Sequence, residues 1–365
     1  MLNKIYNSVF FEPVYFLVRI FFILKEYFIR YKYKKADEPT ITLTTLRDYN
    51  KNRAQGPEKL ICLAPFKHMY FKQNGKVTAC CATSVDAYGN INEDSIAAIW
   101  NGKNANELRS RIENYNLSGG CSGCQYSLET KNYNAFIGRI YDEFLPPKKS
   151  SYPTEMTFEI SNTCNLECIM CTGEFSNLIR KNIEKLPDIP DYYDEHFFEQ
   201  IKEFLPHLKR VRFMGGEPFL IKQYEPIMKF LVEHNADCKI HIQTNGTILN
   251  NAVKQIIESK HVEISISIDS LQKETYEKIR KNANFERVIS NLNYFSERAK
   301  KYNQLININY CVMYDNWMEV PSIVKFCDKN KFTLNLIPVD YPRISSLRIC
   351  TKKYLQNILK YSIEN

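Results

Sequence analysis

The chain has 365 residues, 12 of them cysteine, and its 49 basic and 41 acidic side chains leave a formal net charge of +8. Hydrophobic residues make up 44% and charged residues 25%, which is ordinary for a globular protein and excludes a chain that is disordered throughout. The length is sufficient for two or three structural units. Basic residues are spread along the chain rather than gathered in one block, so the charge does not predict a nucleic-acid partner.

The N-terminal end of the chain is predicted to form a hydrophobic and basic helix. Residues 9–31 are densely apolar, and Glu12, Arg19 and Glu26 recur every seven residues, on one narrow stripe of such a helix. Arg19 interrupts the run, so the roughly 20 apolar residues of a membrane-crossing helix are not available. The basic stretch 25–35 suits an anionic membrane surface. An in-plane membrane anchor and packing on the protein or on a partner both stay open.

Changes in composition predict five segments. They are a hydrophobic and basic helix (1–35), a connector (36–59), a cysteine-rich domain (60–130), a linker (131–153) and a barrel domain (154–365). The linker is predicted from the proline-rich and polar run at residues 146–153. The chain shows no cleavable signal peptide, so its clustered cysteines indicate metal ligands in a reducing, cytoplasmic setting, with membrane association as an open addition.

The barrel segment alternates short β-rich runs with helical stretches. The predicted strands are Met156–Ser161, Arg210–Met214, Lys239–Thr244, Glu263–Asp269, Ile306–Met313 and Thr333–Ile337, and the predicted helices include His196–Leu205, Ile227–Val232 and Val288–Phe295. Six strand-then-helix units imply parallel strands joined by right-handed crossovers. Either a doubly wound sheet or an open barrel satisfies this order.

The faces of the strands decide between these two folds. Glu263, Ser265 and Ser267 share one face of their strand while Ile264 and Ile266 share the other, and the remaining strands repeat this alternation. Strands of an ordinary open parallel sheet are apolar on both faces, because helices cover both. The fold class is therefore predicted as α/β, an open six-stranded parallel (β/α)6 partial TIM barrel whose polar lumen holds a ligand.

Three cysteines directly follow the first predicted strand. Cys164, Cys168 and Cys171 lie within eight residues, where barrel active sites form at the carboxyl ends of the strands. Three thiolates can bind three irons of a cubane cluster and leave the fourth iron open. A zinc or purely structural site, completed by a distant cysteine, is the alternative for the triplet alone.

A glycine-rich turn with a carboxylate follows the second predicted strand. Gly215 and Gly216 allow the backbone to approach a ligand closely, and Glu217 supplies the carboxylate before Pro218. This turn and the CxxxCxxC triplet together resemble the radical S-adenosylmethionine (radical SAM) superfamily, and the resemblance extends from Glu155 to about Pro338. The Met170 position departs from the family, where an aromatic residue often precedes the third cysteine.

The resemblance implies a set of cofactor-binding residues. These are Gly215, Gly216, Glu217, Asn245, Ser267, Asp269, Arg280 and Asn309. Within this set, the Glu217 loop is expected to hold the methionyl amino group, and Ser267 and Asp269 are expected to approach the ribose. Arg280 is expected to pair with a carboxylate, with a solvated helix charge as its alternative. Cys311 faces the predicted lumen and is the candidate catalytic donor of a hydrogen atom or proton.

The same resemblance implies the chemistry. A [4Fe–4S] cluster with one open iron binds S-adenosylmethionine, and an electron from a partner such as a flavodoxin or ferredoxin cleaves the sulfonium. The resulting 5′-deoxyadenosyl radical abstracts hydrogen from a substrate.

The N-terminal cysteines form a second pattern. Cys62, Gly75 and Cys80 follow a C-x12-G-x4-C spacing, and Cys121 and Cys124 form a later C-x2-C pair. This pattern resembles the auxiliary-cluster domains called SPASM and twitch, placed here before the barrel instead of after it. The resemblance implies a second [4Fe–4S] cluster on these four cysteines, with a zinc ribbon as the alternative.

The function expected from these features is radical modification of a peptide or protein side chain, because auxiliary-cluster relatives mostly act on such substrates. The alternative is a radical SAM dehydrogenase or epimerase for a small molecule or a sugar of a surface-polymer pathway. The non-enzyme alternative is an iron–sulfur or zinc binding protein with a degenerate barrel.

Overall fold

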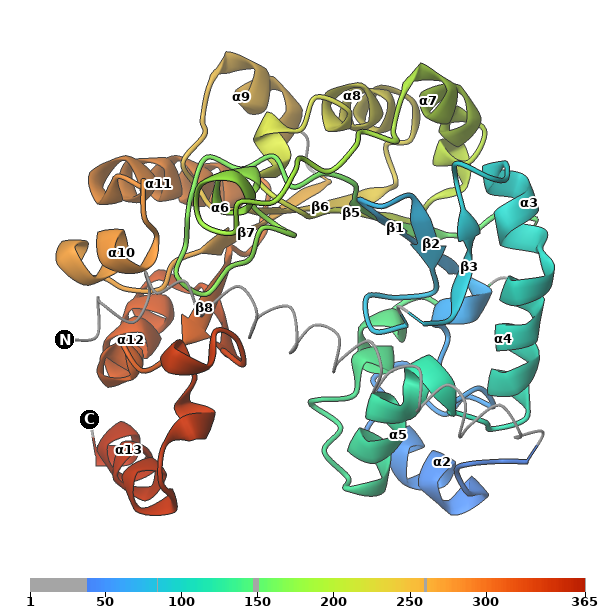
Figure 1. The fold of residues 1–365 in the computed structure, drawn as a ribbon, viewed down its shortest axis with the longest axis horizontal. Helices are drawn as coiled ribbons and strands as arrows, with labels where there is room; N and C mark the ends of the chain where they lie inside the picture. Colours follow the sequence, from blue (N-terminus) through green and yellow to red (C-terminus); the bar gives the residue numbers. More distant parts are fainter. Residues whose placement is uncertain (1–37, 84, 147–150, 259–260, 365) are drawn as a thin grey trace. The chain divides into compact units, whose positions relative to one another are not determined.

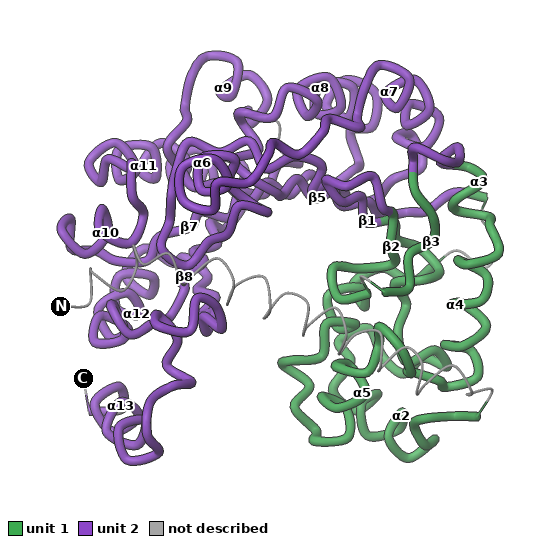
Figure 2. Tube along the Cα trace, viewed as in Figure 1, with its two compact units in different colours: residues 1–69, 77–90, 97–151 green, residues 70–76, 91–96, 152–365 purple. Residues whose placement is uncertain are grey.

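A computed structural model describes residues 38–83, 85–146, 151–258 and 261–364. The chain forms two compact units (Figure 2). Unit 1 comprises Met1–Met69, Val77–Asn90 and Ala97–Ser151, and unit 2 comprises Tyr70–Lys76, Ile91–Ile96 and Tyr152–Asn365. Within the described residues, no helix is long and apolar enough to span a membrane. The helix predicted for residues 1–35 lies outside the part of the chain that the structure describes.

Unit 2 is built on parallel strands. They are β4 (Glu155–Glu159), β5 (Arg210–Phe213), β6 (Lys239–Thr244), β7 (Val262–Ser267), β8 (Asn307–Val312) and β9 (Thr333–Pro338). Each strand pairs in parallel with the next one along the chain, and Tyr70–Lys72 of strand β1 (His68–Lys72) extends the sheet beyond β4. The predicted fold class, an open α/β barrel of six parallel strands with a small cysteine-rich N-terminal domain, is confirmed.

Helices follow the strands of unit 2, and most of them lie on the outside of its curved sheet (Figure 1). They are α6 (Asn177–Asn182), α7 (Glu195–Lys202), α8 (Tyr224–His234), α9 (Asn251–Ile257), α10 (Lys273–Ile279), α11 (Phe285–Lys301), α12 (Val320–Asn330) and α13 (Lys352–Glu364). Short 3-10 helices are η5 (Leu205–His207), η6 (Pro218–Leu220), η7 (Trp317–Glu319), η8 (Arg343–Ser345) and η9 (Leu347–Ile349). Several helices begin at a side-chain cap, as at Asp194, Asn250 and Asn284, which accept hydrogen bonds from backbone N–H groups of the first turn.

The inner face of the sheet is polar, as the alternating strands predict. Arg212 donates to Glu155 Oε2 over 3.0 Å, and His241 Nε2 lies 2.7 Å from Ser265 Oγ. Ile264 and Ile266 on the opposite face of β7 are buried. Burial lowers the pKa of His241 to about 4, and the neighbouring Arg212 cation acts in the same direction, so this side chain is neutral at pH 7.

Unit 1 is a small domain of short elements around cysteines and aromatic residues. Its described elements, including those that reach into unit 2, are α2 (Leu43–Asn50), η2 (Ala64–Phe66), β1, β2 (Lys76–Thr78), β3 (Ala87–Asn90), α3 (Ile96–Asn101), α4 (Lys103–Glu113), η3 (Gly119–Cys121), α5 (Ser122–Glu129) and η4 (Ile137–Tyr141). Helix α2 lies in the predicted connector, and η4 lies in the predicted linker.

A buried charge cluster explains why these two segments pack within unit 1. Arg53 Nε lies 3.0 Å from Asp142 Oδ2, and Tyr49 donates a hydrogen bond to the same carboxylate. Phe136 packs edge-on against the Tyr49 ring at 4.9 Å, and both rings are buried. The aromatic residues near 136–141 therefore belong to the folded domain and do not form an extended linker. The predicted domain boundaries otherwise stay predictions.

Candidate functional site

The loop between β4 and α6 holds Cys164, Cys168 and Cys171, all partly exposed and none in a disulfide. Its backbone is fixed at several points. Glu167 N donates to Lys281 O over 3.1 Å, and Ile169 N donates to Ile279 O over 2.9 Å. These bonds hold the loop against the end of helix α10, so the three thiols occupy defined positions.

Polar hydrogen-bond donors lie beside two of these thiols. Asn245 Nδ2 is 3.9 Å from Cys164 Sγ, and Arg280 Nη1 is 3.9 Å from Cys168 Sγ. The pKa of Cys168 is raised to about 11 and that of Cys171 to about 12, chiefly by burial; neighbouring thiols act in the same direction, and the Arg280 cation opposes them. The three thiols lie within eight residues of one loop. A bound metal centre deprotonates its thiol ligands outright, so these cysteines can serve as ligands in spite of their raised pKa.

The glycine turn after β5 packs directly on the cysteine loop. Gly216 N donates to Ser161 O over 3.0 Å, and Glu217 N donates to Thr163 O over 2.8 Å. Gly215 has a φ of +107°, and a Cβ at Gly216 would lie 2.2 Å from Thr163 O. Only glycine allows this approach, so the turn supports the segment that enters the cysteine loop.

Glu217 is fully buried and accepts three hydrogen bonds. They come from Thr244 Oγ1 at 2.8 Å, Asn245 N at 2.8 Å and Phe219 N at 3.2 Å. Burial raises the pKa of Glu217 to about 7 in spite of these donors. The carboxylate thus fixes the end of β6, and through it the side chain of Asn245 beside Cys164. This bracing role was missed in the sequence, because the contact joins residues that are 28 positions apart.

Arg280 and Asp269 form an ion pair of 2.7 Å, with both side chains buried. Asp269 Oδ1 also accepts a hydrogen bond of 2.6 Å from Cys311 N. The alternative of a solvated charge for Arg280 is therefore wrong, because Asp269 compensates its charge in the interior. Contacts of these two residues with the cofactor stay predictions, since both already have partners within the protein.

The remaining predicted site residues lie on β7 and β8. Ser267 and Asn309 are paired in the strand register, and Asn309 Oδ1 accepts from Asn335 Nδ2 over 3.0 Å. Cys311 is partly exposed and packs with Met170 on a small apolar cluster that includes Met313. Burial raises the pKa of Cys311 to about 12, so its thiol is protonated at pH 7. Met170, in place of the usual aromatic residue, thus packs against the same apolar cluster as Cys311.

Asn316 is a supporting residue that the sequence did not indicate. Its Nδ2 donates to Asp269 O over 2.8 Å and to Cys311 O over 2.9 Å, and Tyr310 Oη donates to its carbonyl. It is buried although it lies in a loop. An asparagine in a polar loop carries no periodic signal, so only the fold reveals this bridge between β7 and β8.

Unit 1 brings four cysteines around one cavity. They are Cys62, Cys80, Cys121 and Cys124, and apolar residues such as Leu108 and Tyr141 complete the lining. Burial raises the pKa of Cys62 and Cys121, and the charges of the other thiols raise both further. Cys81 is exposed and does not line the cavity. The structure therefore brings together the four cysteines that the spacing selected.

Both cysteine sets suit an iron–sulfur cluster. Among the residues that the structure describes, no three histidine, cysteine, aspartate or glutamate side chains converge on the position of a single metal ion. A [4Fe–4S] cluster takes each thiolate at a different iron, so its ligands lie apart from one another. The barrel set offers three thiolates and the set in unit 1 offers four.

Comparison with known families agrees with this geometry. Residues 158–327 match the radical SAM superfamily, and residues 62–125 match SPASM, an iron–sulfur cluster-binding domain. These two matches support a radical SAM domain, of a superfamily of enzymes, preceded by a SPASM-type iron–sulfur domain. The cofactors of the chain are a catalytic [4Fe–4S] cluster, S-adenosylmethionine and auxiliary iron–sulfur in the N-terminal domain. The match of that domain favours iron over zinc.

Curated relatives cover about half of the chain. The GTP 3′,8-cyclase of Aliarcobacter butzleri is 29% identical over 183 residues, which are 49% of this chain and 53% of that protein. The GTP 3′,8-cyclase of Nautilia profundicola is 25% identical over 216 residues, which are 55% of this chain and 62% of that protein. The chain therefore spans only part of the length of these relatives.

These relatives correct the expected substrate class. The prediction of a peptide or protein side chain as substrate is wrong, because the relatives are named for GTP, a small molecule. That prediction rested on the usual substrates of auxiliary-cluster proteins, and such a domain does not determine the substrate. The alternative of a small-molecule substrate fits better.

Solved structures similar to this chain include radical SAM proteins. Native anSMEcpe with bound AdoMet has 24% sequence identity and a TM-score of 0.43, and the match covers 57% of this chain and 59% of that chain. Streptococcus suis SuiB bound to S-adenosylmethionine has 18% identity and a TM-score of 0.42, with 66% of this chain and 52% of that chain covered.

Proposed function

We propose that this chain reductively cleaves S-adenosylmethionine and abstracts a hydrogen atom from a small polar molecule. The observation that carries the proposal is the arrangement of Cys164, Cys168 and Cys171 beside the glycine turn and Asn245. A cluster bound there supplies the electron for the cleavage. The non-enzyme alternative would not explain why the glycine turn packs so closely on the cysteine loop.

The roles of the protein residues follow from their contacts. The three thiolates hold the cluster, and Asn245 and Arg280 donate to two of them, which orients the sulfur atoms. The Glu217 turn offers backbone groups for the methionyl end of the cofactor. Ser267 and Asn309, which are paired in the strand register, are assigned to the nucleoside end. Cys311 is the candidate donor of a hydrogen atom to the substrate.

The polar lumen and the relatives together support a small polar substrate. Arg212, His241 and Ser265 line the inner face of the strands and form hydrogen bonds there. The curated relatives are named for GTP, so nucleotides are the first class of compound to test. A sugar derivative is the next class.

Anaerobic incubation with S-adenosylmethionine and dithionite tests the reaction. We expect release of 5′-deoxyadenosine, and no release from the Cys164→Ala, Cys168→Ala or Cys171→Ala variants. Release by any of the three variants would refute the proposed cluster ligands. With GTP carrying deuterium on its ribose, we expect deuterium in the 5′-deoxyadenosine. If 5′-deoxyadenosine stays unlabelled with deuterated GTP but gains deuterium from a deuterated sugar nucleotide, the substrate is a sugar derivative instead.

The proposal includes two partners. A flavodoxin or ferredoxin supplies the electron. Residues 1–35 attach the protein to the anionic cytoplasmic face of a membrane. The basic stretch 25–35 supports the attachment. Deleting residues 1–35 should release the protein from vesicles rich in anionic lipid and leave 5′-deoxyadenosine release unchanged. Equal vesicle binding by the full and shortened chains would exclude the anchor.

A further inference from the structure

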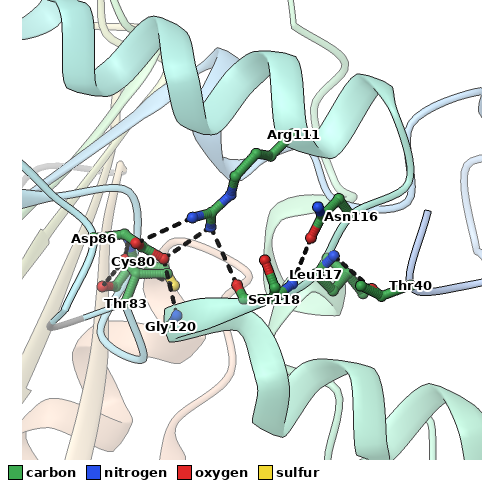
Figure 3. Close-up of polar contacts among 9 residues, drawn as sticks. All are labelled: Thr40, Cys80, Thr83, Asp86, Arg111, Asn116, Leu117, Ser118 and Gly120. Carbon is green, nitrogen blue, oxygen red and sulfur yellow. Dashed lines mark hydrogen bonds and ion pairs between the residues drawn. The ribbon is translucent and has the colours of Figure 1, made fainter. Parts of the chain in front are cut away.

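An ion pair lies next to the cysteine cavity of unit 1 and has no role in the function described so far. Arg111 of helix α4 contacts Asp86 through both ends of its guanidinium group, with Nη1 to Oδ1 at 3.2 Å and Nη2 to Oδ2 at 2.9 Å (Figure 3). The Arg111 side chain is 28% exposed and the Asp86 side chain is 20% exposed. Water therefore screens this pair less than it screens a surface pair.

Asp86 connects the two loops that carry cysteines of the cavity. Its N–H donates to Thr83 O over 3.1 Å, and Thr83 Oγ1 lies 3.8 Å from Cys80 Sγ. On the other side, Asp86 Oδ2 accepts a hydrogen bond of 2.9 Å from Gly120 N, directly before Cys121. Figure 3 shows this carboxylate between the two loops.

The glycines before Cys121 make this contact feasible. Gly119 has a φ of +67°, and a Cβ at Gly120 would lie 2.9 Å from Asp86 Oδ2. A side chain at Gly120 would push the carboxylate away from the Cys121 loop. The sequence Gly119-Gly120-Cys121 thus suits close packing around Asp86.

Arg111 reaches the same loop from helix α4. Its Nη2 donates to Ser118 O over 3.2 Å, in the loop that leads to Cys121. The turn from Asn116 to Ser118 is held by its own bonds, including Ser118 N to Asn116 Oδ1 at 2.9 Å. One cation and one anion therefore lie beside the same cysteine ligand.

We propose that Arg111 and Asp86 are positioning residues of the auxiliary iron–sulfur cluster and that they shift its reduction potential in opposite directions. The proposal rests on Cys62, Cys80, Cys121 and Cys124 as the cluster ligands. Reduction adds negative charge to the cluster, so the adjacent Arg111 cation favours the reduced form and the Asp86 carboxylate opposes it. Hydrogen bonds and charges around cluster sulfur atoms are known determinants of potential.

A redox titration of the auxiliary cluster alone tests the proposal. The full chain with Cys164, Cys168 and Cys171 replaced by Ala retains only the ligands of unit 1, and electron paramagnetic resonance follows its reduction. Arg111→Gln should shift the midpoint potential to more negative values, and Asp86→Asn should shift it to more positive values. The double variant should lie between the two. Arg111→Lys, which keeps the charge, should recover part of the shift.

A matched control is available on the same helix. Lys103 and Glu107 form an exposed pair on α4 at 3.7 Å, with exposures of 86% and 61%. Lys103→Gln and Glu107→Gln should leave the potential unchanged, because solvent screens these charges. Iron content is measured for every variant, so that a change of potential is separated from loss of the cluster.

Three results would overturn the proposal. They are unchanged potentials in Arg111→Gln and Asp86→Asn with iron retained, shifts of the same sign in both, or zinc in place of iron. If Arg111→Gln loses its iron, the midpoint potentials of Arg111→Lys and Asp86→Asn, measured with iron retained, test the proposal instead. The ligand set is tested separately. If iron is retained in the Arg111 and Asp86 variants but lost when Cys62, Cys80, Cys121 and Cys124 are replaced, the four cysteines are the ligands even if the potentials do not change.

Discussion

Arg280 Nη2 lies 2.7 Å from Asp269 Oδ2, and the two side chains are 6% and 0% exposed. Arg280 Nη1 is at the same time 3.9 Å from Cys168 Sγ, and Asp269 accepts a hydrogen bond from Cys311 N. A single buried ion pair thus joins the cysteine loop to strand β8. Its charges are compensated only while both partners are present.

Replacing Arg280 by Met should destabilise unit 2 strongly. The variant leaves Asp269 buried without its cation, and breaking such a pair costs about 3–5 kcal/mol in the free energy of unfolding. Urea unfolding followed by the fluorescence of Trp317, in a Trp100→Phe background, measures the change. Lys278→Met is the control, since Lys278 is 68% exposed in its pair with Asp315, and such a pair contributes under about 1 kcal/mol. Equal losses in the two variants would contradict the buried pair.

Glu217 should make the stability of unit 2 depend on pH. Burial raises its pKa from an ordinary value of 4.5 to about 7, so the folded state favours the protonated carboxyl. The unfolded chain releases this proton near pH 4.5, and the folded chain retains it until about pH 7. The contribution of Glu217 to stability is therefore present below pH 4.5 and is lost as the pH rises to about 7.

The difference in unfolding free energy between wild type and Glu217→Gln measures this contribution. The unfolding free energy of the wild type should fall relative to that of Glu217→Gln between about pH 4.5 and pH 7, and the difference should stay constant above that range. A flat difference over this range would mean that the pKa of Glu217 is ordinary. Iron content should stay near the wild-type value, because Glu217 is not a cluster ligand.

Gly216→Ala should reduce iron binding in the barrel. The added Cβ would lie 2.2 Å from Thr163 O, so the backbone that enters the cysteine loop has to move. Iron analysis in a background without the cysteines of unit 1 isolates this site. Gly123→Ala in the same background is the control and should leave the barrel iron unchanged, because a Cβ there meets nothing within 4 Å. Full iron content in Gly216→Ala would show that the loop tolerates the displacement.

Replacing Cys62, Cys80, Cys121 and Cys124 together by Ala should remove about half of the iron, because the two clusters have separate ligand sets. Release of 5′-deoxyadenosine should continue, since the barrel ligands are intact. Iron analysis and Mössbauer spectroscopy measure the loss. The buried Cys238 and Cys327 serve as controls, and their replacement by Ala should leave the iron unchanged. Unchanged iron in the quadruple variant would leave the chain with one cluster.

The sequence by itself determined the barrel and predicted the candidate cluster ligands, because both depend on local patterns. Alternation along Val262–Ser267 sets which face of the strand is polar, and polar contacts of Arg212 and Ser265 lie on the inner face of the sheet. Three cysteines within eight residues and a glycine turn after the next strand are readable without any tertiary contact. Each of these features lies within a few residues of chain.

Only the tertiary structure decided what surrounds the ligands. Asn245 meets Cys164 across 81 positions, and Arg280 meets Cys168 across 112. From sequence, a charged residue at the end of a helix is predicted to be solvated. Arg280 is buried instead, because the fold packs it against Asp269. Arg111 and Asp86 likewise become neighbours only when helix α4 packs on the loops of the cysteine cavity. Contacts of this kind depend on how distant segments pack, and no periodicity of the sequence encodes them.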